Sequence, residues 1–202
     1  TDYLVMIYKK EISKITLEEL NTEIFTTIRH SNLRRIEVYE NWIMFLLGKF
    51  YEPLSKTQNP LRLIEGGIAE CGEAVAILNY ISNQFGWNAR FIGLNGHVIS
   101  EVMINQELVA VDPHYGIYFE ISFDQLENAT EDYVLSVLKE SGYSEEIGLW
   151  YYEILNSKED NTVLTFGEAI SPRLKLIENI SEILKWIIPF ALLLFVKLLK
   201  IK

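Results

Sequence analysis

Apolar residues recur at helical spacing in three stretches of the first half of the chain, which predict helices at about 17–29, 36–50 and 71–85. The first helix starts with Thr16 and Glu19, whose spacing is that of a capping box. The second should end before residues 52–60, a stretch with two prolines that we expect to be a surface connection. Gly86 supplies the stop signal for the third helix.

Beyond residue 89 the apolar pattern changes to a period of two or to continuous β-branched runs, at 90–94, 97–104, 107–112 and 117–121. The dipeptides Asn95-Gly96 and Asn105-Gln106 separate the first three runs, which predicts an antiparallel meander. A polar and acidic region at 123–156 is again helical in pattern, and 157–161 should be a loop. The sequence therefore predicts an α+β fold, with helices packed on a small antiparallel sheet.

The length of 202 residues and the apolar content of 49% suit one compact domain, expected at 1–182, followed by a hydrophobic helix at 183–202. The first 182 residues contain 14 basic and 28 acidic side chains, a net charge of −14, and the tail carries +4. An acidic body repels phosphate backbones, and no basic stripe with interleaved aromatic residues offsets this repulsion. We therefore expect no nucleic-acid partner.

Cys71 is the only cysteine, so the chain has no internal disulfide and one thiol for chemistry. This cysteine lies at the first turn of a predicted helix, where the partial positive charge of the helix N-terminus favours a thiolate. His97 begins one predicted strand and Asp112 ends the next. If these strands pair through a two-residue turn, facing positions sum to about 211, and His97 lies near residues 112–114. The register predicts that His97 and Asp112 come together, and it also brings His114 into consideration. With Cys71 these residues form the expected site.

The order of four short motifs around these residues resembles the core of the transglutaminase-like superfamily. The motifs are Cys71-Gly72-Glu73-Ala74, Phe85-Gly86-Trp87-Asn88-Ala89-Arg90, Gly96-His97-Val98-Ile99-Ser100-Glu101-Val102 and Leu108-Val109-Ala110-Val111-Asp112-Pro113. The resemblance covers residues 61–121. It implies a papain-like core in which Cys71 is the nucleophile, His97 is the base and Asp112 orients the histidine. This core would occupy 61–125, between N-terminal helices at 1–60 and a helical region at 126–182.

The chain departs from the family pattern near the histidine and the aspartate. Where members often have tryptophan, it has Ile99 and Leu108. No upstream side chain clearly matches the family's oxyanion donor; Gln58 and Asn59 are alternatives, and the backbone amide of Cys71 is the expected donor. These departures keep open an alternative function, a catalytically silent module that holds a peptide or glycan in the same cleft.

The function expected from these residues is a cysteine hydrolase or acyltransferase that acts on an amide or peptide bond through a thioester. The residues do not choose between water and an amine as the acyl acceptor, and the expected site uses no cofactor and no metal. A zinc site made of Cys71, His97, Asp112 and His114 is an alternative, but no short Cys-x-x-Cys or His-x-x-x-His pair anchors it. Arg90 either forms a salt bridge with an acidic neighbour near the site or is a solvated strand residue, and a structural role is favoured.

The C-terminal run at 183–201 is apolar on all sides and carries Trp186 and lysines near its ends. Its uninterrupted part, 186–196, has 11 residues, which at about 1.5 Å each cover about half of a ~30 Å hydrocarbon core. If Lys185 and Lys197 snorkel, the 19 residues of the run reach about 28 Å. We expect this helix to associate with a lipid bilayer, on a side that the sequence leaves open. The alternative is a helix packed on the domain or on a partner protein.

Overall fold

The computed structural model describes residues 2–9, 14–31, 35–158, 160–165 and 171–199. Contacts within the chain divide it into two units, each of which joins two separate stretches of sequence. Unit 1 consists of residues 1–32 and 60–169, and unit 2 consists of residues 33–59 and 170–202. This division differs from the boundary expected after residue 182, because residues 33–59 and 170–182 belong with the C-terminal helix.

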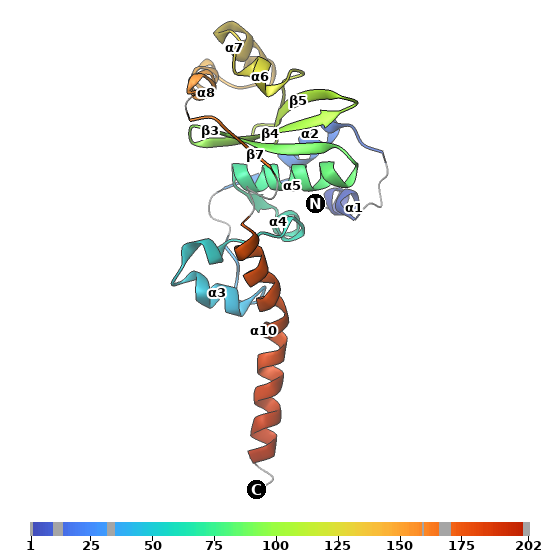
Figure 1. Cartoon of the computed structure of the whole chain (residues 1–202), viewed down its shortest axis with the longest axis vertical. Helices are drawn as coiled ribbons and strands as arrows, with labels where there is room; N and C mark the ends of the chain where they lie inside the picture. The colour runs from blue at the N-terminus through green and yellow to red at the C-terminus, as the bar shows by residue number, and fades with distance from the viewer. Residues whose placement is uncertain (1, 10–13, 32–34, 159, 166–170, 200–202) are drawn as a thin grey trace. The chain divides into compact units, whose positions relative to one another are not determined.

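A five-stranded antiparallel sheet forms the frame of unit 1 (Figure 1). Its strands are β3 (Asn88–Leu94), β4 (His97–Ile104), β5 (Glu107–Asp112), β6 (Ile117–Tyr118) and β7 (Thr162–Leu164), in the order β6-β5-β4-β3-β7. The pairing of β3, β4, β5 and β6 confirms the predicted meander. Facing residues of β4 and β5 sum to 211, as predicted, because Asn105 and Gln106 form a two-residue turn in which both have positive φ.

One face of this sheet is covered by α5 (Cys71–Gln84), the helix predicted from the third apolar pattern. Its buried stripe, which includes Ile77 and Ile81, packs against Val102 and Val111 of the sheet. The same core receives side chains from α1 (Asp2–Tyr8), α2 (Leu17–Thr27) and α4 (Pro60–Gly66). The structure confirms the capping box at the start of α2. Periodicity missed α1 and α4 because a seven-residue helix has only two turns in which to repeat.

The opposite face of the sheet is covered by α6 (Phe123–Leu126), α7 (Glu131–Glu140) and α8 (Glu145–Asn156), as Figure 1 shows. The region predicted as one helical stretch at 123–156 is thus three helices. A hydroxyl side chain caps the N-terminus of each: Ser122, Thr130 and Ser144. Val134, Leu138 and Tyr151 are buried against the sheet, so this face has a core of its own.

An ion pair with one fully buried partner, Glu101, ties this second core to the sheet. The Arg90 Nε atom lies 2.6 Å from Glu101 Oε2, and the other oxygen of Glu101 accepts the backbone amide of Phe123 at 2.7 Å. Glu101 is fully buried, so both bonds offset the cost of removing its charge from water. Of the two alternatives considered for Arg90, the structure shows the salt bridge.

Unit 2 contains α3 (Trp42–Gly48), the 3-10 helix η1 (Glu52–Ser55) and α10 (Pro172–Leu199). The helix predicted at 36–50 is shorter than expected. Asn41 ends the non-helical segment because its side chain accepts the backbone amide of Met44 at 3.1 Å, an N-cap that starts the helix at Trp42. η1 lies in the stretch 52–60 that was expected to be a connection.

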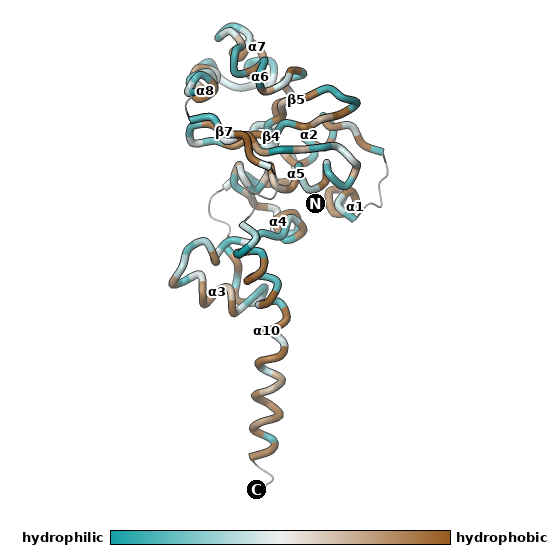
Figure 2. Tube along the Cα trace, viewed as in Figure 1, coloured by the Kyte–Doolittle hydropathy of each residue, from teal (hydrophilic) through white to brown (hydrophobic). Residues whose placement is uncertain are grey.

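The C-terminal helix α10 begins eleven residues before the predicted start at 183, and its predicted end at 201 lies outside the described residues. Figure 2 shows that its second half is coloured almost entirely as hydrophobic, and most of these side chains are exposed. None of the helices in the described ranges combines the length and apolar content needed to cross a bilayer.

Candidate active site

Cys71 is the first residue of α5, a position set by a turn in the preceding chain. Gly67, with φ of 63°, turns the backbone after α4 into β2 (Ile68–Ala69), which pairs in parallel with β1 (Arg29–His30). The helix start is then fixed by Glu73, whose carboxylate accepts the backbone amide of Glu70 at 2.8 Å. The half-buried thiol of Cys71 therefore lies at the positive end of a 14-residue helix dipole.

His97 is the first residue of β4, directly after a tight hairpin turn. Gly96 supplies the positive φ of 82° that this turn requires. The imidazole is 5% exposed, and its Nε2 atom lies 2.6 Å from Asp112 Oδ2. The Cys71 side chain also interacts electrostatically with His97 and contributes to the raised pKa of the imidazole. The structure thus brings the three predicted residues together in the order cysteine, histidine, aspartate.

Asp112 ends β5 and is fully buried, with donors on both carboxylate oxygens. Oδ1 accepts the backbone amides of His114 at 2.8 Å and Tyr115 at 3.1 Å, and Oδ2 accepts the Tyr151 hydroxyl at 2.8 Å as well as His97. Burial alone would raise the pKa of Asp112, but the His97 charge and these hydrogen bonds hold its pKa below the usual value. The group is therefore a carboxylate at neutral pH.

The electrostatics of His97 follow from this carboxylate. Burial alone would lower the pKa of the imidazole, but the charge and hydrogen bond of Asp112, together with Cys71, raise the pKa of His97 to about 9. His97 is therefore an imidazolium at neutral pH. This cation interacts electrostatically with the Cys71 side chain, which lies at the N-terminus of α5.

Aromatic rings from the turn between β5 and β6 and from α8 enclose His97. The ring centroids of Tyr115, Trp150 and Tyr151 lie 5.5, 6.0 and 5.9 Å from that of His97. Tyr143 packs on Tyr115 with ring centroids 5.2 Å apart, and its hydroxyl donates to the Tyr115 carbonyl at 2.7 Å. These rings exclude water from the bond between His97 and Asp112, which strengthens it.

The contribution of α8 to this site was not predicted from the sequence. Tyr151 is fully buried, and burial together with the Asp112 charge raises its pKa well above the usual value, so it stays a hydrogen-bond donor. One signal was present: Ile147, Tyr151, Ile154 and Leu155 recur at helical spacing, which marks Tyr151 as part of a buried stripe. The pattern does not reveal that the Tyr151 hydroxyl binds Asp112.

A cavity of about 260 Å³ opens beside the thiol, lined by His30, Ser31, Glu70, Cys71 and His114. The two histidine rings lie 4.4 Å apart between centroids. Burial lowers the pKa of His30, and burial together with the neighbouring histidines lowers the pKa of His114 to about 4. Both rings are therefore neutral at neutral pH, and the only charge on the lining side chains, apart from that of a thiolate, is the Glu70 carboxylate.

The other candidate residues receive different placements. His114 lines this cavity, and its backbone amide, rather than its ring, binds Asp112. Among the described residues, no group of three or more His, Cys, Asp or Glu side chains has an arrangement suited to a metal ion, so the zinc alternative gains no support. Gln58 and Asn59, considered as oxyanion donors, belong to unit 2, whereas Cys71 belongs to unit 1.

Comparisons of this chain with protein families, with curated proteins and with solved structures found no match.

Proposed function

We propose that unit 1 is a transglutaminase-like cysteine enzyme that cleaves amide or peptide bonds through a thioester. The observations that carry the proposal are the place of Cys71 at a helix N-terminus, its electrostatic interaction with His97, and the bond from His97 to the buried, fourfold hydrogen-bonded Asp112. A histidine and carboxylate that merely stabilise a fold would not need a thiol at a helix N-terminus as the third member. This convergence favours the enzyme over a catalytically silent binding module.

In the proposed reaction, the Cys71 thiolate attacks the carbonyl carbon of the amide. The backbone amide of Cys71, one of the free N–H groups at the start of α5, donates to the developing oxyanion. His97 gives its proton to the amide nitrogen as the carbon–nitrogen bond breaks, and the amine leaves. Water or an amine then attacks the thioester, His97 takes its proton, and the carbon–sulfur bond breaks to restore the thiolate.

The cavity next to Cys71 suits a neutral or cationic group of a substrate better than an anionic one. Its two imidazoles are uncharged at neutral pH, so its lining carries no positive charge that would pair with an anion. A volume of about 260 Å³ is close to the lower end of ordinary ligand pockets, roughly 300 Å³. It suits one amino-acid side chain or a short acyl group. A glutamine or lysine side chain has the required size and charge.

Alkylation by iodoacetamide at mildly acidic pH tests the activated thiol. Ordinary thiols react slowly there because few are ionised, whereas a thiolate held by His97 reacts at once. We expect Cys71 to be labelled much faster than a free peptide thiol, and His97→Ala to abolish the difference. Equal rates for the protein, the variant and the peptide would rule out the nucleophile. Cys71→Ser serves as the control for labelling elsewhere.

We also propose that α10 attaches the chain to a lipid bilayer. Its side chains from Trp186 onward are largely exposed and apolar, and Lys197 lies in its last turn. Flotation with vesicles that contain anionic lipid tests this proposal. The full chain should float and residues 1–185 should not, and equal behaviour of the two would reject it.

A further inference from the structure

Unit 2 exposes a second set of large apolar side chains, on α3 and the turn after it. Leu46 and Leu47 of α3 are 50% and 40% exposed, and Phe50 and Tyr51 in the turn are 90% and 57% exposed. Only Met44 of α3 is buried. A helix with one buried residue and several exposed apolar ones has an outer face suited to an interaction surface.

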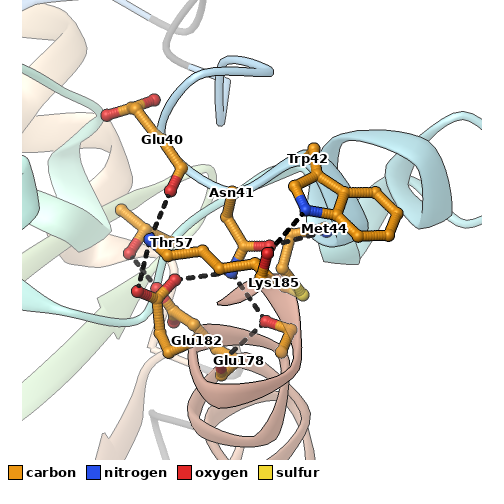
Figure 3. Close-up of polar contacts among 9 residues, drawn as sticks. Glu40, Asn41, Trp42, Met44, Thr57, Glu178, Glu182 and Lys185 are labelled. Carbon is orange, nitrogen blue, oxygen red and sulfur yellow. Dashed lines mark hydrogen bonds and ion pairs between the residues drawn. The ribbon is translucent and has the colours of Figure 1, made fainter. Parts of the chain in front are cut away.

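A polar network fixes α3 to α10 inside unit 2 (Figure 3). The buried side chain of Asn41 donates to Ser181 Oγ at 2.7 Å and to Glu182 Oε1 at 2.5 Å. Lys185 donates to the Glu40 carbonyl at 2.7 Å and lies 2.8 Å from Glu182. Because these bonds are short and largely shielded from water, α3 is held at one defined level along α10.

The same network continues to the segment that leads out of η1. Buried Glu178 accepts the Thr57 hydroxyl at 2.5 Å and the backbone amide of Gln58 at 2.7 Å. Both ends of the α3 and η1 segment are therefore fastened to the first half of α10. Exposure of the α3 leucines is consequently a fixed property of unit 2.

The level at which α3 is held is where the apolar part of α10 begins. The Trp42 indole donates to the carbonyl of Lys185 at 3.1 Å, and the next residue is Trp186, the start of the uninterrupted apolar run. The Lys185 ammonium lies 5.6 Å from the centre of the Trp186 ring. Two tryptophans and a lysine at the start of an apolar run are typical of the boundary between water and lipid.

The charge of unit 2 fits an anionic lipid surface. Its sequence contains ten basic and five acidic residues, a net charge of +5, whereas unit 1 contains eight basic and 23 acidic residues, a net charge of −15. Lys49 lies between Leu47 and Phe50 in sequence and is exposed, with its ammonium 4.7 Å from the centre of the Phe45 ring. Basic side chains beside exposed apolar ones bind interfaces that combine anionic headgroups with acyl chains.

We propose that α3 and the turn at Phe50 and Tyr51 form a second lipid contact, which rests in the interface of an anionic bilayer at the level of Lys185 and Trp186. This inference rests on the proposed attachment of α10. α3 and this turn, called the collar below, then lie in the membrane interface at the level where α10 enters the lipid. The polar network holds the collar and α10 at that level.

Site-specific fluorescence on vesicles of phosphatidylcholine and phosphatidylglycerol tests the collar. A full-length Cys71→Ser chain receives one new cysteine, Phe50→Cys, Ile187→Cys or Glu131→Cys, labelled with an environment-sensitive dye. Ile187 is on α10 and Glu131 is an exposed residue of α7 in unit 1. With nitroxide lipids, we expect a blue shift and loss of emission at positions 50 and 187, and neither at 131.

The outcomes separate the two proposals. Quenching at 187 without quenching at 50 overturns the collar and leaves the α10 attachment standing. Absence of quenching at both positions overturns both. A blue shift at position 50 that needs no lipid indicates a protein partner, including a second copy of the chain, and also overturns the collar.

A matched pair of substitutions gives a second measurement in the full chain. Leu47 of α3 and Leu149 of α8 are both helical leucines, 40% and 38% exposed. Leu47→Glu should weaken partitioning into the vesicles about tenfold or more, because the apolar contact is replaced by a charge repelled by anionic lipid. Leu149→Glu should leave partitioning unchanged. Equal partitioning of the two variants contradicts the inference.

Discussion

Replacing Asp112 with asparagine is expected to lower the pKa of His97 from about 9 to its ordinary 6.5 or below. Asparagine keeps the size of the side chain and can still accept the backbone amides of His114 and Tyr115, but it carries no charge. Burial, which disfavours the imidazolium, is then no longer outweighed. A fall from about 9 to 6.5 corresponds to about 3 kcal/mol of lost stabilisation of the charged ring.

Nuclear magnetic resonance can measure this change directly, because the chain has only three histidines. In the native protein, one ring should titrate near 9, while His114 titrates near 4 and His30 below 6.5. Asp112→Asn should remove the high titration, and Glu131→Gln should leave it in place. The reasoning is refuted if no native histidine titrates above 6.5, or if the high value survives in Asp112→Asn.

The same shift predicts how stability depends on pH. The folded pKa of His97 is raised above the unfolded value, so its contribution is complete below pH 6.5 and is lost as pH rises toward about 9. The native chain should lose up to about 3 kcal/mol over that interval, the cost of a 2.5-unit difference. Urea unfolding of the native chain and of Asp112→Asn measures the difference, since the variant lacks this slope.

Two further substitutions test the contacts that surround the site. Tyr151→Phe removes a buried donor to a carboxylate and should cost about 1.5 to 3 kcal/mol, measured by urea unfolding, while Tyr152→Phe one residue later should change little. Glu101→Gln removes the charge that pairs with Arg90 and should cost about 2 kcal/mol, less than a fully buried pair because Arg90 is 38% exposed. Glu107→Gln, on an exposed position of the same sheet, is its control, and equal stabilities within either pair would contradict the prediction.

The convergence of His97 and Asp112 could be predicted because it depends on local geometry. Two runs of β pattern separated by Asn105-Gln106 have one register that a two-residue turn permits, and that register brings His97 within a few residues of the end of β5. The place of Cys71 at the start of a helix could likewise be predicted, from the helical periodicity of the residues that follow it. Each inference needed only residues that are close in sequence or joined by a short turn.

The contacts that the sequence did not reveal span long separations. Tyr151 binds Asp112 across 39 residues, through the packing of α7 and α8 on the sheet. Asn41 binds Ser181 across 140 residues. Because the sequence does not reveal this contact, residues 33–59 were predicted to belong to the main domain, whereas they belong to unit 2. Periodicity identifies a buried face, but it does not identify which distant face covers it.

The predicted catalytic core at 61–125 should therefore fail to fold by itself, although it contains Cys71, His97 and Asp112. On one face of the sheet it lacks α1 and α2, and on the other it lacks α7 and α8. Full burial of one large apolar side chain contributes about 1.5 to 3 kcal/mol, and Val134, Leu138, Tyr151 and Leu155 are all fully or almost fully buried. The stabilisation lost with these four side chains is comparable to the whole free energy of unfolding of a domain, roughly 5 to 15 kcal/mol.

We expect the fragment 61–125 to show no cooperative unfolding and no rapid alkylation of Cys71, whereas the chain 1–185 shows both. A folded, rapidly labelled fragment would mean that α8 is dispensable to the site, and that the hydrogen bond from Tyr151 to Asp112 does not position it.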